Sequence, residues 1–200
     1  MENSEITALE SQILELTTRL NELRKAAPGT QVTNYAFDTQ AGPTTLLELF
    51  ADMNTLLLIH NMGQACRYCT LWADGFNGLL PHLESVMSVV LVSKDSPALQ
   101  RQFANSRGWR FRLASHGGGA YITEQSARDG AGNMPGAVVY TREGDVIRRK
   151  NACVFGPGDL YCSAWHLLGL AGLGEVEWTP QYAYWKRPEK MEDGGANLPD

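Results

Sequence analysis

Four cysteines are the residues of this chain best suited to chemistry. Cys66 and Cys69 form a Cys-x-x-Cys pair, whereas Cys153 and Cys162 stand apart with eight residues between them. A thiolate is both a nucleophile and a metal ligand, so the cysteines indicate redox chemistry or metal binding. The polar opening Met-Glu-Asn-Ser is no signal peptide, and the cytosol keeps thiols reduced. Two permanent structural disulfides are therefore not expected.

The Cys-x-x-Cys pair follows an apolar run, Thr55–Ile59, that has the length of a buried strand, and it opens a helix-compatible stretch that reaches Leu83. At the first turn of a helix, free backbone N–H groups and the helix dipole stabilise the Cys66 thiolate. Arg67 adds a positive charge beside it. Cys69, one turn later on the same helix face, is within reach to attack a mixed disulfide on Cys66 and release a reduced product.

A proline-containing segment far along the chain also supports thiol-disulfide chemistry at Cys66 and Cys69. Met134-Pro135-Gly136 directly precedes a predicted strand, Ala137–Tyr140. A proline there can adopt a cis peptide bond that shapes a groove for a substrate backbone. The strand edges near it could pair with an extended peptide.

The elements that must position these residues follow from the apolar pattern. The predicted strands are Val32–Phe37, Asn54–His60, Val86–Val92, Trp109–Leu113, Ala137–Tyr140 and Asp145–Arg149. Helices are expected after Cys66, after the Ser96-Pro97 cap, and over Gly158–Leu170. The order strand, helix, strand, helix predicts a βαβ unit. The glycine-interrupted stretch Ser115–Asn133 has no clear period, and the final stretch from Glu189 is expected to be disordered.

An amphipathic helix is predicted before this unit. Its apolar residues recur at a spacing of 3, 4, 3, 4, 3, and they are Ile6, Leu9, Ile13, Leu16, Leu20 and Leu23. Pro28-Gly29 ends the helix. The stripe spans fewer than three heptads, too short to pair stably alone. Two roles are open for this helix: it packs on its own domain, or it is the arm of a homodimer or a swapped helix.

The order of buried strand, Cys-x-x-Cys pair, helix, strand, helix and Met134-Pro135 resembles the core of the thioredoxin superfamily. The similarity covers about Thr30–Leu170, and the Tyr35–Phe50 and Val89–Ser96 segments look like those of peroxiredoxins. Trp72–Gly78 and Arg107–Phe111 are similar to a bacterial thioredoxin-like domain family of unassigned function. The resemblance implies an α/β, thioredoxin-like fold, a central mixed sheet flanked by helices with an N-terminal hairpin. We divide the chain into a helix (1–28), a thioredoxin-like domain (29–174) and a tail (175–200).

The resemblance also implies roles for single residues. Cys66 is the expected nucleophile, Cys69 the resolving thiol and Pro135 the cis-proline. The residues expected to contact substrate are Met134, Pro135, Arg67 and Tyr68. The sequence departs from the family in having Ala65 rather than tryptophan before the pair, and Arg67-Tyr68 rather than Gly-Pro within it.

His60 stands where thioredoxins carry a buried acid, six residues before the first cysteine. A neutral imidazole there can relay a proton, although a histidine at a strand end is more often a hydrogen-bonded structural residue. Peroxiredoxins place proline seven residues and threonine or serine three residues before the reactive cysteine. Counting back from Cys66 gives Ile59 and Gly63, and counting from Cys69 gives Met62 and Cys66, so neither cysteine fits the peroxidase pattern.

These observations predict a thiol-disulfide oxidoreductase that acts on a disulfide-containing protein or a small thiol substrate without an organic cofactor or metal. Three alternatives stay open: a peroxide-reducing thiol protein, a binding module without turnover that uses the aromatic tail Trp178–Trp185, and a zinc site. The zinc ligands would be the four cysteines, with His166 as an additional candidate ligand. For Cys153 and Cys162 alone, inert packing is expected. The alternative role is a second dithiol that passes electrons to the first.

Composition excludes two classes of partner. The 200 residues carry 17 Lys and Arg against 22 Asp and Glu, a net charge of −5, so the chain lacks the positive charge that nucleic acid binding requires. The longest apolar run, Leu56–Ile59, is far too short to span a membrane. The predicted location is therefore the cytoplasm.

Overall fold

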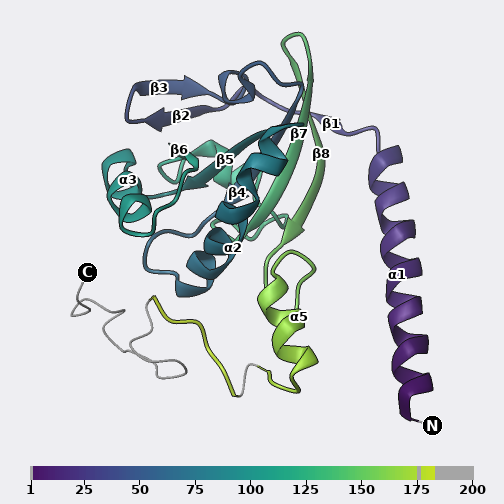
Figure 1. Ribbon diagram of the computed structural model, residues 1–200. Helices are drawn as coiled ribbons and strands as arrows, with labels where there is room; N and C mark the ends of the chain where they lie inside the picture. Colours follow the sequence, from purple (N-terminus) through teal and green to yellow (C-terminus); the bar gives the residue numbers. More distant parts are fainter. Residues whose placement is uncertain (1, 175–176, 183–200) are drawn as a thin grey trace.

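The computed structural model describes residues 2–174 and 177–182 (Figure 1). Its helices are α1 (Glu2–Ala26), η1 (Glu48–Phe50, a 3-10 helix), α2 (Arg67–Glu84), α3 (Pro97–Ser106), α4 (Ala120–Glu124) and α5 (Ser163–Leu170). Its strands are β1 (Thr30–Gln31), β2 (Ala36–Thr39), β3 (Gly42–Thr45), β4 (Thr55–His60), β5 (Ser88–Ser93), β6 (Arg112–Ser115), β7 (Gly136–Glu143) and β8 (Val146–Val154). The predicted α/β class is confirmed.

Within the described residues the strands form one mixed sheet in the order β1-β8-β7-β4-β5-β6-β2-β3. Strands β4, β5 and β6 are parallel, and β7 joins the other edge of β4 antiparallel. The carboxyl end of β4 therefore lies at the centre of the sheet. Polar groups that follow parallel strands gather at such an end, which makes it a common place for a functional site.

Each face of the sheet is covered by its own apolar core. Helices α2, α3 and α5 contribute Trp72, Ala104 and Trp165 to the core on one face. On the other face, the residues before and within η1 and those of α4 pack against the sheet, with Leu46 and Tyr121 among the buried residues. Side chains along β4 alternate between these cores, as the pleat of a strand requires. Helix α2 and the core beneath it thus fix the first turn that carries Cys66.

Helix α1 stands beside the rest of the molecule in Figure 1 and meets it at its C-terminal end. The side chains of Lys150 and Asn151 in β8 donate hydrogen bonds to backbone carbonyls at that end, with Asn151 Nδ2 3.3 Å from the oxygen of Arg24. The guanidinium of Arg24 lies over the ring of Tyr161, 5.9 Å from its centre. The predicted helix is confirmed, and most of its side chains are exposed beside the described part of the domain.

Several predicted boundaries are wrong for identifiable reasons. Of the expected strand Val32–Phe37, only Ala36 and Phe37 lie in a strand, β2, which pairs with β3 and β6. The first part lies in the connection from β1, where the N–H of Val32 donates to the carbonyl of Ile147 in β8 at 3.0 Å. The strand expected at Trp109–Leu113 begins only at Arg112, since the indole N–H of Trp109 donates to Asp74 in α2 at 2.7 Å. The irregular stretch after Ser115 contains α4.

The last helix begins at Ser163, not at Gly158. Asp159 prevents an earlier start, because its carboxylate accepts the backbone N–H groups of Gly156 and Tyr161 and the indole N–H of Trp72 at 2.6–3.0 Å. Of the predicted tail, residues 175–176 and 183–200, including the stretch from Glu189 expected to be disordered, lie outside the described residues. No helix in the described part of the chain combines the length and apolar character needed to cross a membrane.

Candidate functional site

Cys66 and Cys69 are joined by a disulfide at the first turn of α2, with 5.2 Å between their Cα atoms. Cys66 is the N-cap residue, and its sulfur accepts the backbone N–H of Cys69 at 3.1 Å. Cys66 is partly exposed, whereas Cys69 is only 3 % exposed. The prediction that the pair opens a helix after a buried strand is confirmed. Cys66 is therefore the more accessible cysteine of the pair, and Cys69 is buried.

The loop between β4 and α2 is held by two side chains that follow parallel strands. Asn61 comes after β4 and accepts the N–H of Gly63 at 2.8 Å, while Asp95, just after β5, accepts the N–H of Gln64 at 2.8 Å. Gly63 has a φ of +119°, and a Cβ on it would lie 2.9 Å from both Asp95 carboxylate oxygens. Its carbonyl in turn accepts the N–H of Cys66 at 3.0 Å. This support was missed in the sequence; polar residues at the ends of neighbouring strands are the signal that could have found it.

Met134 and Pro135 lie beside this loop. In the pairing of β4 with β7, Gly136 is opposite His60, so the residues before Gly136 run past the end of β4. Asn133 donates a side-chain hydrogen bond to the carbonyl of Met62 at 3.2 Å. The structure therefore brings the Met134-Pro135 segment next to the loop that leads to Cys66. Contact of the segment with a substrate stays a prediction.

Of the two residues between the cysteines, Arg67 is exposed and Tyr68 is partly buried. The Tyr68 ring stacks on Trp165 of α5, with ring centres 6.2 Å apart and planes at 24°. Trp178 packs edge-on against the same tryptophan at 5.8 Å. The described part of the aromatic tail thus packs back on its own domain, while Tyr184 and Trp185 lie outside the described residues. Their use in a partner contact stays a prediction.

His60 points away from α2, into the core on the other face of the sheet. It is 3 % exposed, and its Nε2 shares a 2.6 Å hydrogen bond with the hydroxyl of Tyr121. Burial, with smaller contributions from His116 and Arg149, lowers the pKa of His60 to about 3. The imidazole is therefore neutral at physiological pH, as a relay would require. Its hydrogen bond belongs to a buried polar cluster, which fits the structural role that the sequence also allowed.

Two buried histidines make folding stability depend on pH. Burial also lowers the pKa of His116, from 6.5 to about 4. Below about pH 6.5 the unfolded chain therefore binds protons that the folded chain does not, and stability falls. We expect each histidine to contribute a loss approaching about 1.4 kcal/mol per pH unit between the unfolded and folded pKa values. Urea unfolding of the wild type and His60→Gln at several pH values measures this, and equal slopes for both proteins would contradict it.

Cys153 and Cys162 are free and do not join the first pair. Cys153 lies opposite Ala137 in the sheet and lines an apolar cavity of about 320 Å³ between α2 and β8. Burial raises the pKa of both thiols, which disfavours the reactive thiolate.

All four cysteines and His166 are described, and no group of three or more His, Cys, Asp or Glu among the described residues could hold a metal. The structure therefore does not bring the four cysteines together as the ligands of a zinc site.

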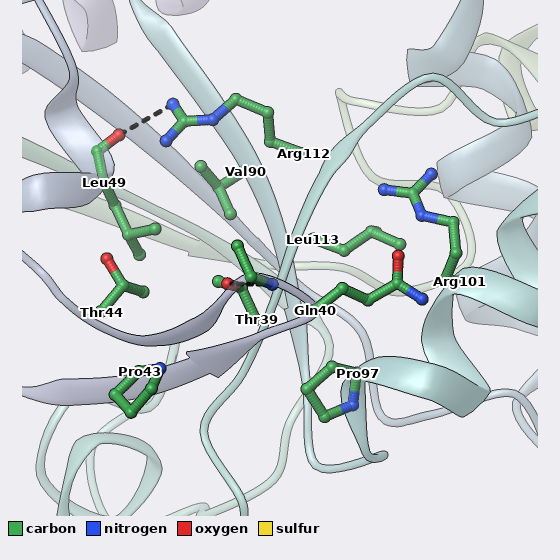
Figure 2. A pocket seen from close by; sticks show the side chains of 11 residues that line it. Thr39, Gln40, Pro43, Thr44, Leu49, Val90, Pro97, Arg101, Arg112 and Leu113 are labelled. Carbon is green, nitrogen blue, oxygen red and sulfur yellow. Dashed lines mark hydrogen bonds between the residues drawn. The ribbon is translucent and has the colours of Figure 1, made fainter.

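A larger pocket of about 390 Å³ lies elsewhere, between the β2–β3 hairpin, β6 and α3 (Figure 2). Arg101 and Arg112 line it together with threonine and proline side chains. The guanidinium of Arg112 is engaged, because it donates to the carbonyl of Leu49 at 3.0 Å and to the Ser88 hydroxyl at 2.7 Å. None of the predicted site residues lines this pocket. This pocket is therefore separate from the disulfide site.

Comparison with known proteins gives a family and a fold. A family model described as a bacterial protein of unknown function, DUF899, matches residues 2–191. Among solved structures, peroxidoxin BcpB of Mycobacterium tuberculosis is 20% identical with a TM-score of 0.51, covering 76% of this chain and 99% of that one. Reduced Prx3 of Vibrio vulnificus in complex with H2O2 is 14% identical with a TM-score of 0.51, covering 72% and 94%. No curated protein matches. The structural similarity shows a shared fold, and it confirms the predicted thioredoxin-like architecture.

Proposed function

Because this chain belongs to DUF899, a bacterial family of unknown function, we propose its function from its own site: it is a thiol-disulfide oxidoreductase that uses Cys66 and Cys69. The observation that carries the proposal is the disulfide between a partly exposed and a buried cysteine at the first turn of α2. A permanent structural bridge gains little from closing so short a loop. The asymmetry fits a reversible pair, because only the attacking sulfur has to meet the substrate.

In the reduced state the Cys66 thiolate attacks one sulfur of a substrate disulfide. A bond forms between the Cys66 sulfur and that substrate sulfur, the substrate disulfide breaks, and the second substrate sulfur leaves as a thiolate that takes up a proton. The N–H groups at the start of α2 favour the Cys66 thiolate, and Arg67 next to it adds a positive charge.

Cys69 completes the exchange. Its thiolate attacks the Cys66 sulfur, the mixed disulfide breaks, and the first substrate sulfur leaves as a thiolate. Two electrons pass from the protein to the substrate, and the Cys66–Cys69 disulfide of this structure is the oxidised product. A dithiol reductant restores the reduced pair, and run in reverse the same steps oxidise a substrate dithiol. The Met134-Pro135 segment beside the loop is the part of the surface expected to support the mixed disulfide.

The proposal is tested by turnover of the wild-type protein with a dithiol reductant and three acceptors: a protein disulfide, a small-molecule disulfide and hydrogen peroxide. We expect a disulfide to be reduced faster than in the absence of protein, and peroxide consumption to stay near the uncatalysed rate. Ile59 and Gly63 stand where peroxiredoxins use proline and threonine or serine, which is why peroxide is expected to be a poor acceptor. Rapid peroxide consumption would favour the peroxidase, and no turnover with any acceptor would favour a binding module.

A further inference from the structure

The apolar stripe of α1 lies open to solvent along its length. Five of its six residues are 52–65 % exposed, namely Ile6, Leu9, Ile13, Leu16 and Leu23, and Leu20 is partly buried. An isolated helix of this kind is marginal in water, because a helix in a protein is stabilised mainly by burial of its apolar face. Among the described residues of the domain, Lys150, Asn151 and Tyr161 hold the C-terminal end of the helix.

We propose that the stripe is covered by α1 of a second copy of this chain, running antiparallel. The residues Ile6, Ile13 and Leu20 alternate with Leu9, Leu16 and Leu23 as the two apolar positions of a heptad. When two copies are reversed on each other, Ile6 meets Leu23, Leu9 meets Leu20 and Ile13 meets Leu16. Each of the six residues of the stripe then has an apolar partner from the other copy.

Charge selects the antiparallel direction. On one side of the stripe the residues directly before Ile6, Ile13 and Leu20 are Glu5, Gln12 and Arg19. On the other side the residues directly after Leu9, Leu16 and Leu23 are Glu10, Thr17 and Arg24. Each row is therefore acidic toward the N-terminal end of the helix and basic toward the C-terminal end.

These flanking rows set the orientation of a helix pair. In a parallel pair one row faces the other row, which places Glu5 beside Glu10 and Arg19 beside Arg24, so like charges meet at both ends. In an antiparallel pair each row faces its own reversed copy. The acidic end then lies alongside the basic end, Glu10 toward Arg24 and Glu5 toward Arg19, and the repulsion is replaced by attraction.

The antiparallel arrangement also brings the partner's first turn to the end of α1 that is fixed to the domain. Arg24 at that end lines the apolar cavity next to Cys153 and contacts Tyr161. The antiparallel arrangement therefore places the first turn of the second copy next to the domain surface around Tyr161. A domain surface at this position matters because a stripe of fewer than three heptads is short for a pair held by the helices alone.

The test is the mass of the full chain in solution by light scattering and sedimentation, with two matched variants. Ile13→Asp places a charge at the centre of the stripe, and Leu14→Asp places the same charge on a residue that is 68 % exposed and outside the stripe. The helix propensity cost is similar in both, and neither side chain packs on the domain. We expect Ile13→Asp to raise the dimer dissociation constant at least about 100-fold, because it buries an unpaired charge, and Leu14→Asp to change it little.

Orientation is tested by Glu10→Lys. This change should weaken the antiparallel dimer by placing a second positive charge toward Arg24, whereas it would strengthen a parallel dimer by removing the repulsion between Glu5 and Glu10. A wild type that is monomeric at every accessible concentration overturns the proposal, as does a dimer that Ile13→Asp leaves intact. A dimer that Glu10→Lys tightens overturns the antiparallel direction. None of these results depends on the chemistry of Cys66.

Discussion

Cys66→Ser should abolish disulfide reduction, lowering the turnover rate by about three orders of magnitude or more. The hydroxyl of serine is not ionised at neutral pH and does not replace a thiolate as the attacking group. The effect is measured with a disulfide substrate and a dithiol reductant, against Cys153→Ala as the control. Cys153 is a free, half-buried thiol on β8, so its loss should leave turnover close to that of the wild type. Equal loss in both variants would contradict the assignment.

Cys69→Ser should behave differently from Cys66→Ser, because it removes the second step and leaves the first. The Cys66 thiolate still attacks the substrate, but no internal thiol releases the product. We therefore expect a mixed disulfide between Cys66 and the substrate to accumulate, which intact-mass measurement detects as an added substrate mass that a reductant removes. If the adduct formed on Cys153 or Cys162 instead, the order of roles proposed for the pair would be wrong.

Gly136→Ala should destabilise the fold by about 3 kcal/mol or more, through overpacking against atoms that cannot move aside. A Cβ on Gly136 would lie 2.3 Å from the carbonyl oxygen of Cys153 and 2.4 Å from the Cβ of Ala127. The first of these atoms belongs to the backbone of β8, which is paired with β7 at that point. Relief would require the two strands to separate beside Pro135 and the end of β4.

The matched control is Gly75→Ala. Gly75 lies inside α2, is exposed, and has no neighbouring atom within 4 Å of an added Cβ. The same change there should stabilise the protein by about 0.5–1 kcal/mol, because alanine favours the helix. Urea unfolding of both variants measures the two opposite shifts. A Gly136→Ala protein as stable as the wild type would show that the β7–β8 contact is looser than this packing implies.

The cysteine site was the part of the structure most readable from the sequence. An apolar run of strand length, a Cys-x-x-Cys pair and a helix-compatible stretch are contiguous, so local pattern alone predicts a cysteine at the start of α2. The Ser96-Pro97 cap predicted the start of α3 for the same reason. Where one short segment contains both the signal and its consequence, the prediction was confirmed.

Features that depend on contacts between distant segments were predicted less well. The sequence around Trp109 does not indicate that its indole donates a hydrogen bond to Asp74, so the later start of β6 was not predicted. The sequence around Gly158 likewise does not indicate the hydrogen bond from Trp72 to Asp159. The support of the Cys66 loop by Asp95 joins residues from two strands and was likewise missed. The side of the sheet to which His60 points follows from strand register, which is fixed only when β4 pairs with its neighbours.

The central claim is that Cys66 and Cys69 form one reversible redox pair, and the most direct test is an equilibrium titration in defined redox buffers. After rapid alkylation, mass measurement separates chains with two free thiols from those with a disulfide, and peptide mapping locates the bond. We predict a single two-electron transition in which Cys66 and Cys69 lose their labels together, while Cys153 and Cys162 are unchanged. A Cys66 and Cys69 pair that never forms a disulfide with each other at any accessible potential would contradict the account.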